Sequence, residues 1–198
     1  MERQVLSTFS TIMVKSMDPD FECQEDLIKW IYDARERDPE GTKMTNRGGW
    51  QSKHSNFFNT DRTFQPFINY IIERVSESFE GVVKRPVSIT DLWVNINPPG
   101  AYNLEHDHAE GHFTAVLWVK APEGSGQFVM RNPNGYAQYS IIESFEDTLS
   151  NFTTHICGHD PSDGDLLIIP SHIRHLVDTN YSTEDRISVA FNLKLVNQ

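Results

Sequence analysis

The sequence predicts an α+β protein in which two amphipathic helices support a β-sandwich or barrel. Helical periodicity is confined to roughly the first 80 residues, where apolar side chains recur at three- and four-residue spacing. From residue 87 onward, short segments rich in β-branched and aromatic residues alternate with clusters of Gly, Pro and Asn. Two helices followed by a run of short strands indicate helices that brace one face of the β structure.

Length and composition are those of a globular protein that buries a core without disulfides. Of the 198 residues, 38% are hydrophobic and 11% are aromatic. We find no internal repeat or linker, and we predict one domain over residues 1–198, with helical support over about 18–80 and the β core over about 87–198. The net charge of −11 argues against nucleic-acid binding, which requires clustered Lys and Arg.

The compartment is predicted to be the cytoplasm. Cys23 and Cys157 are too few and too distant in sequence for a secreted disulfide framework. The N-terminal residues lack the basic start and continuous apolar run of a signal peptide. No apolar stretch approaches the roughly 20 residues that cross a bilayer, so we expect no membrane partner.

One edge strand and two helices are expected before the β core. Residues Val5–Met17 alternate unevenly, as in an edge strand. Helices are expected over about 20–37 and about 64–79, and Gly81 lies just beyond the second. The apolar face of the second helix comprises Phe64, Phe67, Ile68, Ile71, Ile72, Val75 and Phe79.

The strands of the core are short and bounded by turn residues. Their expected positions are Ile89–Asn97, Phe113–Lys120, Gln127–Arg131, Thr153–Cys157, Asp165–Ile169 and Arg186–Val196.

A His-x-His motif is the first candidate for a metal site. In an extended segment His106 and His108 point to the same face, because strand side chains alternate with a period of two. Neighbouring imidazoles can bind Fe, Zn, Cu or Ni. A polar loop with incidental histidines is the simpler explanation of such a motif when it stands alone.

A third histidine strengthens the metal interpretation. Residues Gly164–Pro170 have the pattern of a turn, a buried strand and a proline stop, and His175 follows shortly after. His106, His108 and His175 would bind one face of a metal and leave the other open to water, substrate and oxygen. His172 is an alternative third ligand, but the residues after His175 favour His175.

Arg186, Ser188 and Ala190 share one face of the last predicted strand. An Arg and a Ser inside a barrel are costly to bury without an anionic partner that accepts hydrogen bonds. A carboxylate satisfies both, because the guanidinium offers two parallel donors. The simpler alternative is an Arg that pairs with an acidic residue of the protein.

Together these residues resemble the Fe(II)- and 2-oxoglutarate-dependent oxygenases, whose fold is the double-stranded β-helix, a jelly roll shared with the cupins. The similarity covers residues 49–198, about three-quarters of the chain, and is strongest to a little-characterised bacterial and phage branch with a His-x-His motif. The motifs are Gly49-Trp50-Gln51-Ser52, Trp93–Asn97 leading through Gly100 to His106-x-His108, the hairpin at 119–126, Gly164-Asp165-Leu166-x-x-x-Pro170-Ser171 before His175, and Arg186-Ile187-Ser188-x-x-Phe191-Asn192.

The resemblance implies an oxygenase that hydroxylates an unidentified small-molecule or peptidyl substrate with O2, while 2-oxoglutarate is decarboxylated to succinate. A homodimer is the oligomeric state that we would test for this chain. The implied ligands of Fe(II) are His106, His108 and His175. The implied residues for the distal carboxylate of 2-oxoglutarate are Arg186 and Ser188, with further hydrogen bonds from Asn95, Asn97 or Tyr102.

The sequence departs from the wider superfamily at one ligand. That superfamily has His-x-Asp or His-x-Glu, whereas position 108 is histidine. Glu110 follows His108 at the His-x-Glu spacing, so His108, Glu110 and His175 form an alternative ligand set. We prefer His106 with His108, because that pair matches the closer branch.

The same residues also resemble the cupins, although Phe113 stands where a cupin glutamate is expected. The alternative functions are therefore a cupin-type dioxygenase or isomerase without 2-oxoglutarate, and a non-catalytic ligand-binding β-helix. Arg186 with Ser188 favours the oxygenase over the cupin enzyme. The three histidines argue against a non-catalytic domain.

Three weaker features remain. His155-x-Cys157-x-His159 could bind a metal on one strand face, although incidental histidines at a strand end are simpler. The polar loop 42–59 is long enough to form a lid. Three tryptophans could line a substrate cleft, although packing in the core is the simpler role. They are Trp50, Trp93 and Trp118.

Overall fold

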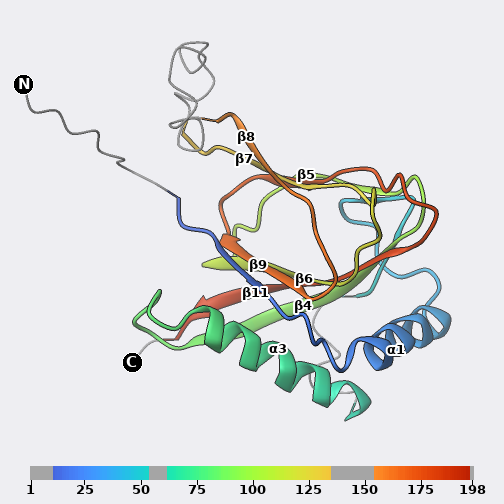
Figure 1. The fold of residues 1–198 in the computed structure, drawn as a ribbon, viewed down its shortest axis with the longest axis horizontal. Helices are drawn as coiled ribbons and strands as arrows, with labels where there is room; N and C mark the ends of the chain where they lie inside the picture. Colours follow the sequence, from blue (N-terminus) through green and yellow to red (C-terminus); the bar gives the residue numbers. More distant parts are fainter. Residues whose placement is uncertain (1–10, 54–61, 135–153, 197–198) are drawn as a thin grey trace, which may run out of the picture.

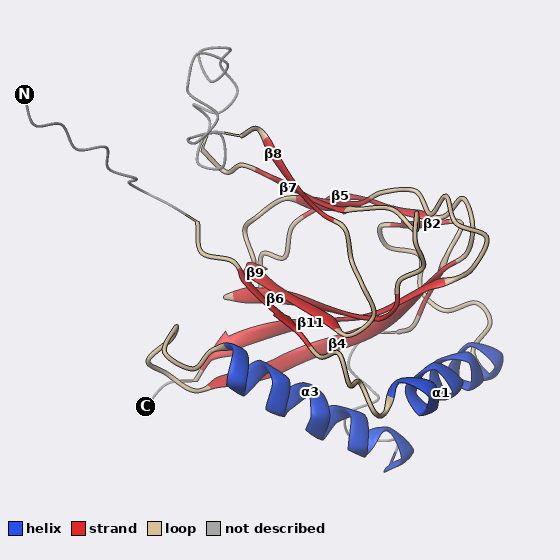
Figure 2. Ribbon diagram, viewed as in Figure 1, coloured by secondary structure: helices blue, strands red, loops and turns tan. Residues whose placement is uncertain are grey.

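The computed structural model describes residues 11–53, 62–134 and 154–196. Two β-sheets face each other, and both described helices lie against the outer face of one of them (Figures 1 and 2). This arrangement confirms the predicted α+β class and the double-stranded β-helix. None of the described helices is long and apolar enough to cross a membrane.

The larger sheet, here called the major sheet, has six antiparallel strands, and its central strand β11 pairs with β4 on one side and β6 on the other. In spatial order the strands are β1 (Val14–Met17), β9 (Asp165–Pro170), β6 (Phe113–Lys120), β11 (Arg186–Leu195), β4 (Val87–Asn97) and β3 (Trp50–Gln51).

The smaller sheet, here called the minor sheet, has five strands, and its central strand β10 pairs with β5 and β7. In spatial order the strands are β2 (Asn46–Arg47), β5 (Tyr102–His106), β10 (His175–Val177), β7 (Phe128–Arg131) and β8 (Ile156–His159). The short strands β2 and β3 follow each other in sequence but belong to different sheets. Their connection at Gly48-Gly49 therefore joins the two layers at one edge.

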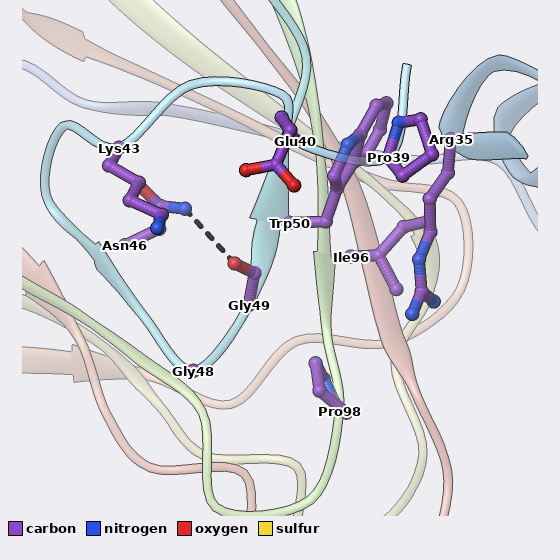
Figure 3. A pocket seen from close by; sticks show the side chains of 10 residues that line it. All are labelled: Arg35, Pro39, Glu40, Lys43, Asn46, Gly48, Gly49, Trp50, Ile96 and Pro98. Carbon is purple, nitrogen blue, oxygen red and sulfur yellow. Dashed lines mark hydrogen bonds between the residues drawn. The ribbon is translucent and has the colours of Figure 1, made fainter. Parts of the chain in front are cut away.

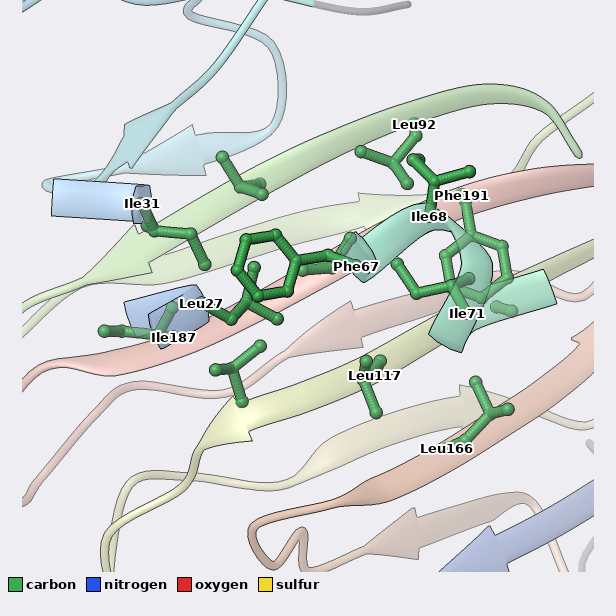
Figure 4. Packing of buried hydrophobic residues seen from close by; sticks show 14 of the residues in the cluster. Leu27, Ile31, Phe67, Ile68, Ile71, Leu92, Leu117, Leu166, Ile187 and Phe191 are labelled. Carbon is green, nitrogen blue, oxygen red and sulfur yellow. The ribbon is translucent and has the colours of Figure 1, made fainter. Parts of the chain in front are cut away.

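The main core lies between the major sheet and two helices, α1 (Gln24–Arg37) and α3 (Gln65–Ser78), the latter preceded by the 3-10 turn η1 (Arg62–Phe64). Strand side chains alternate in direction, so every second residue of β11 packs on the helices. Figure 4 shows these side chains meeting those of α1 and α3. Fully buried members include Leu27, Ile31, Phe64, Leu92, Val94, Ile187, Val189 and Phe191.

Several predicted boundaries were wrong. The first helix begins at Gln24, because the preceding residues form a turn in which the backbone N–H of Asp20 donates to the Asp18 carboxylate. The strand expected at Thr153–Cys157 is β8 instead, since pairing with β7 sets its ends. Ile72 shares the apolar periodicity of α3 but is 50% exposed. Residues 5–10 of the predicted edge strand lie outside the described residues.

No bounds were predicted from the sequence for four short strands: β2, β3, β5 and β10. Each has only two to five residues, and their composition is mostly polar. Residues 42–53 of the candidate lid contain β2 and β3, so this part is built into the edges of the two sheets. The remainder of the candidate lid, 54–59, lies outside the described residues.

Candidate metal and cosubstrate site

Three histidines come together on the inner face of the minor sheet. His106 ends β5, His175 begins β10, and the two residues are directly paired across these strands. His108 follows two residues after β5. The potential ligand atoms of all three lie within 4.8 Å of one another, and among the described residues no other group of three or more His, Cys, Asp or Glu has this geometry.

A β-bulge gives His106 its inward direction. Asn103 pairs with Val177 and His106 pairs with His175, so three residues of β5 span only two of β10. Without the extra residue, positions 103 and 106 would point to opposite faces of the sheet. Bulges often re-aim a side chain beside a functional site, and here the bulge turns both Asn103 and His106 into the barrel.

The hydrogen bonds of two histidines direct their second ring nitrogens toward the cluster. His106 Nδ1 lies 2.7 Å from the Leu104 carbonyl oxygen, and His175 Nδ1 lies 2.9 Å from that of Ile173. A carbonyl oxygen only accepts, so each Nδ1 carries the proton and each Nε2 keeps its lone pair. Such bonds fix the tautomer of metal-binding histidines.

Burial keeps these imidazoles neutral. Loss of solvent around His175, reinforced by neighbouring His106, lowers the pKa of His175 to about 4. Burial likewise lowers the pKa of His106. Neutral imidazole is the form that binds metals, so the cluster is ready to bind a cation at neutral pH.

Aromatic rings enclose the cluster. The His108 ring stacks on Trp93 with centroids 5.5 Å apart, and the His175 ring stacks on Phe128 at 4.9 Å. Trp118 packs edge-on against Phe128 within a second apolar cluster inside the barrel. Of the three tryptophans, Trp50 therefore packs in the helix-side core, Trp93 borders the histidines and Trp118 packs between the sheets.

The alternative metal ligands lie elsewhere. Glu110 and His172 are exposed and do not join the three-histidine group. His155, Cys157 and His159 likewise form no such group within the described chain. His159 points instead toward Asp165, with 3.1 Å between Nε2 and Oδ2.

Arg186 begins β11 and is only 1% exposed. Its neighbour Ile187 packs on the helices, so strand alternation turns Arg186 and Ser188 toward the barrel interior. Its Nη1 donates to the backbone carbonyls of Ser125 and Asp178, whereas Nη2 is buried without a hydrogen-bond partner in the described chain. Burial lowers the pKa of Arg186 to about 10, which still leaves the guanidinium charged at neutral pH.

Asparagines line the interior beside Arg186. Asn97 pairs with Arg186 and Asn95 with Ser188 across β4 and β11, which places these side chains on one face. Asn97 Nδ2 donates to Asn103 Oδ1 at 3.1 Å and so links the two sheets. The Asn95 side-chain oxygen is buried and has no hydrogen-bond partner among the described residues.

Among the three residues predicted to add hydrogen bonds to the cosubstrate, Tyr102 is the exposed one. Tyr102 is 39% exposed, and it alternates with Asn103, which is buried and bonded to Asn97. Asn103, the next residue along β5, occupies the interior position. A residue-by-residue alternation pattern around the bulge would have been needed to identify it.

The sequence interpretation also missed a row of three polar residues on the inner face of the major sheet. Asn192 pairs with Asp91 on one side and with Thr114 on the other. Asn192 shares the strand face of Arg186 and Ser188, and this even spacing was the available signal. The Asn192 Oδ1 is buried, and no residue in the described part of the chain donates a hydrogen bond to it. The row lies two residues beyond Trp93, which contacts His108.

A separate pocket of about 270 Å³ lies outside the barrel, between the end of α1 and the β2–β3 connection (Figure 3). Asn46 Nδ2 donates to the Gly49 carbonyl across this connection. A Cβ at Gly49 would lie 2.8 Å from the Ile96 carbonyl oxygen, so glycine is required for this close approach. None of the candidate site residues lines this pocket.

Comparison with known families gives one sequence match. The profile of a family described as "Putative 2OG-Fe(II) oxygenase" matches residues 91–192, more than half of the chain. No curated protein sequence matches the chain.

Solved structures share the fold at low sequence identity. A Pseudomonas putida prolyl-4-hydroxylase has a TM-score of 0.58 and 15% identity over 92% of this chain and 93% of that chain. HygX from Streptomyces hygroscopicus was solved with nickel, 2-oxoglutarate and hygromycin B. It has a TM-score of 0.66 and 10% identity over 94% of this chain and 84% of that chain. The viral collagen prolyl hydroxylase of Paramecium Bursaria Chlorella virus-1 was solved with 2-oxoglutarate. It has a TM-score of 0.55 and 14% identity over 92% of this chain and 97% of that chain.

Proposed function

Because this chain belongs to the 2OG-Fe(II) oxygenase family, we propose that it hydroxylates a substrate with O2 while 2-oxoglutarate is decarboxylated to succinate. In this proposal Fe(II) is bound by His106, His108 and His175. The distal carboxylate of 2-oxoglutarate is bound by Arg186 and Ser188. The observation that carries the proposal is the pairing of a three-histidine cluster with a buried, incompletely paired arginine inside one barrel.

The histidine cluster fits a divalent transition metal. Three nitrogen donors on one side of the ion leave further coordination positions for 2-oxoglutarate and O2. His106 and His175 are already in the neutral tautomer that binding needs. Within this donor set all ligands are uncharged, so the site is more cationic than one with a carboxylate ligand.

The environment of Arg186 fits a carboxylate. A buried guanidinium with a free Nη2 leaves a donor unsatisfied, which costs on the order of 1–3 kcal/mol or more because the group is charged. A carboxylate would accept from Nη2 and from the Ser188 hydroxyl. A chain of contacts links Arg186 to the histidine cluster inside the barrel. Arg186 pairs with Asn97, which donates a hydrogen bond to Asn103. Asn103 pairs in turn with Val177, which lies two residues after His175.

The protein contributes orientation and exclusion of water. When bound, Fe(II) with 2-oxoglutarate supplies the oxidising chemistry that inserts one atom of O2 into the substrate. The Leu104 and Ile173 carbonyls hold His106 and His175 in fixed ring orientations. Phe128 and Trp118 make the inner wall apolar, which keeps bulk water from the reacting centre.

We place the substrate at the end of the interior that carries Asp91, Thr114 and Asn192. Arg186 and this row lie at opposite ends of the same face of β11, and Ala190 between them pairs with Trp93 beside the histidines. The cosubstrate would occupy the Arg186 end, so the substrate would approach from the other. The unpaired Oδ1 of Asn192 offers an acceptor for a substrate N–H or O–H donor.

Anaerobic titration tests the proposal. Protein with Fe(II) and 2-oxoglutarate should develop the visible metal-to-ligand charge-transfer band of a chelated keto acid. Arg186→Gln should weaken 2-oxoglutarate binding about 10- to 100-fold, the loss expected for a charge-assisted hydrogen bond worth about 1.5–3 kcal/mol. Arg35→Gln, which removes an exposed arginine on α1, is the matched control and should bind normally.

The outcomes distinguish the alternatives. Iron binding without the band would contradict 2-oxoglutarate dependence and favour a cupin-type enzyme. Absence of iron binding would contradict the metal site. Glu110→Gln should leave iron affinity unchanged, whereas a large loss would support the ligand set with Glu110.

A further inference from the structure

We propose that Glu105, Arg131 and Arg174 form an ion-pair network that positions His106 and His175 from the opposite face of the minor sheet. The inference rests on the proposed metal site, and it assigns to these three residues a positioning role. They are called the Glu105 network below.

The register places the network directly behind the histidines. His106, His175 and Met130 form one row across β5, β10 and β7, because His175 pairs with both of the others. Each network residue is the sequence neighbour of one member of this row. Glu105 precedes His106, Arg174 precedes His175 and Arg131 follows Met130. Neighbouring strand residues point to opposite faces, so the network lies on the outer face.

One carboxylate joins all three chain segments. Glu105 Oε2 lies 2.8 Å from Arg131 Nε, and Glu105 Oε1 lies 3.2 Å from Arg174 Nε. The backbone N–H of Arg131 also donates to the Arg174 carbonyl at 2.8 Å. Both carboxylate oxygens are therefore used, and the bulged strand β5 is tied to the residue that precedes β10 and, beyond β10, to the end of β7.

Neither of the described helices supports the outer face of this part of the barrel. Both described helices lie against the major sheet (Figure 2). The three strands have only three to five residues each, and β5 and β10 change register between His175 and Val177. The spacing of His106 and His175 thus depends on contacts within the minor sheet and on the packing of its inner face against the major sheet.

The expected effect is moderate. Exposed ion pairs are individually weak, worth about 0–1 kcal/mol, and the network side chains are 26–60% exposed. Residues that orient metal ligands typically change metal affinity about 10- to 100-fold. The Glu105 carboxylate is partly exposed and makes two ion pairs, one with Arg131 and one with Arg174. We therefore expect its removal to weaken metal affinity by about 5- to 10-fold.

Cobalt(II) titration of the metal-free full chain measures this effect through affinity and the visible d–d spectrum. Glu105→Gln should weaken binding about 5- to 10-fold and change the spectrum, and Glu105→Asp should restore part of both. The double variant Arg131→Gln/Arg174→Gln separates positioning from charge. It should also weaken binding, although removal of two positive charges alone would strengthen the binding of a cation. Strengthened binding in the double variant would overturn the proposal.

A matched control is the exposed Lys53–Asp38 pair at 2.8 Å, which lies outside the barrel. Asp38→Asn should leave cobalt affinity within about twofold of wild type, and an equal loss there would overturn the proposal. Amide hydrogen exchange of metal-free protein provides a second readout, with faster exchange in β5 and β10 of Glu105→Gln. If wild type binds no cobalt, the metal site is wrong, while unchanged exchange would still overturn the network.

Discussion

The two sheets of the barrel differ in what packs on their outer faces. The major sheet covers its outer face with α1 and α3 and buries a continuous set of apolar side chains there. The minor sheet carries Glu105, Arg131 and Arg174 on its outer face and two of the three clustered histidines on its inner face. Stability is therefore concentrated in one layer, and the geometry of the candidate site in the other.

The largest expected effect tests this division directly. Phe191 is completely buried between the major sheet and the helices, so Phe191→Ala should lower the free energy of unfolding by about 3–5 kcal/mol. Leu176, half-buried on the outer side of β10, is the comparison in the minor sheet. Leu176→Ala should cost about 1 kcal/mol or less, because only part of the side chain leaves an apolar environment. Urea denaturation of metal-free protein measures both, and equal losses would contradict the division.

The sequence was sufficient for the helix-covered layer because its signals are local. Helical periodicity placed α3 almost correctly, and the apolar runs around Val94, Leu117 and Ile168 indicated β4, β6 and β9. The predicted histidines also converge in space. In the minor sheet the bounds of β2, β5 and β10 were not predicted, because segments of two to five residues become strands only through pairing with distant segments. The bulge between Asn103 and His106 depends on the same pairing.

A smaller effect is expected where the two sheets meet. Asn97 of the major sheet donates to Asn103 of the minor sheet in the buried interior. Asn97→Ala would leave the Asn103 oxygen without this donor, which should lower the free energy of unfolding by about 1–3 kcal/mol. Asn69→Ala is the matched control, because Asn69 accepts a comparable hydrogen bond from Gln65 on the exposed side of α3. A loss at Asn97 no greater than at Asn69 would show that this contact contributes little to joining the layers.

The smallest expected effect concerns the other seam between the sheets, where His159 of β8 lies against Asp165 of β9. Burial, followed by the nearby charge of Lys15, lowers the pKa of His159 despite the opposing effect of Asp165. The unfolded chain therefore binds this proton first as the pH falls below about 6.5, and acid favours unfolding until the folded-state pKa is reached.

His106 and His175 have lowered pKa values and contribute in the same direction. His159→Gln removes only the contribution of His159 to this loss of stability in acid. The unfolding free energy of the variant should therefore decline less steeply than that of wild type between about pH 6.5 and 5. Urea denaturation of both proteins across this range measures the two slopes. Equal slopes would mean that His159 does not contribute to the acid sensitivity, which would then arise from other groups such as His106 and His175.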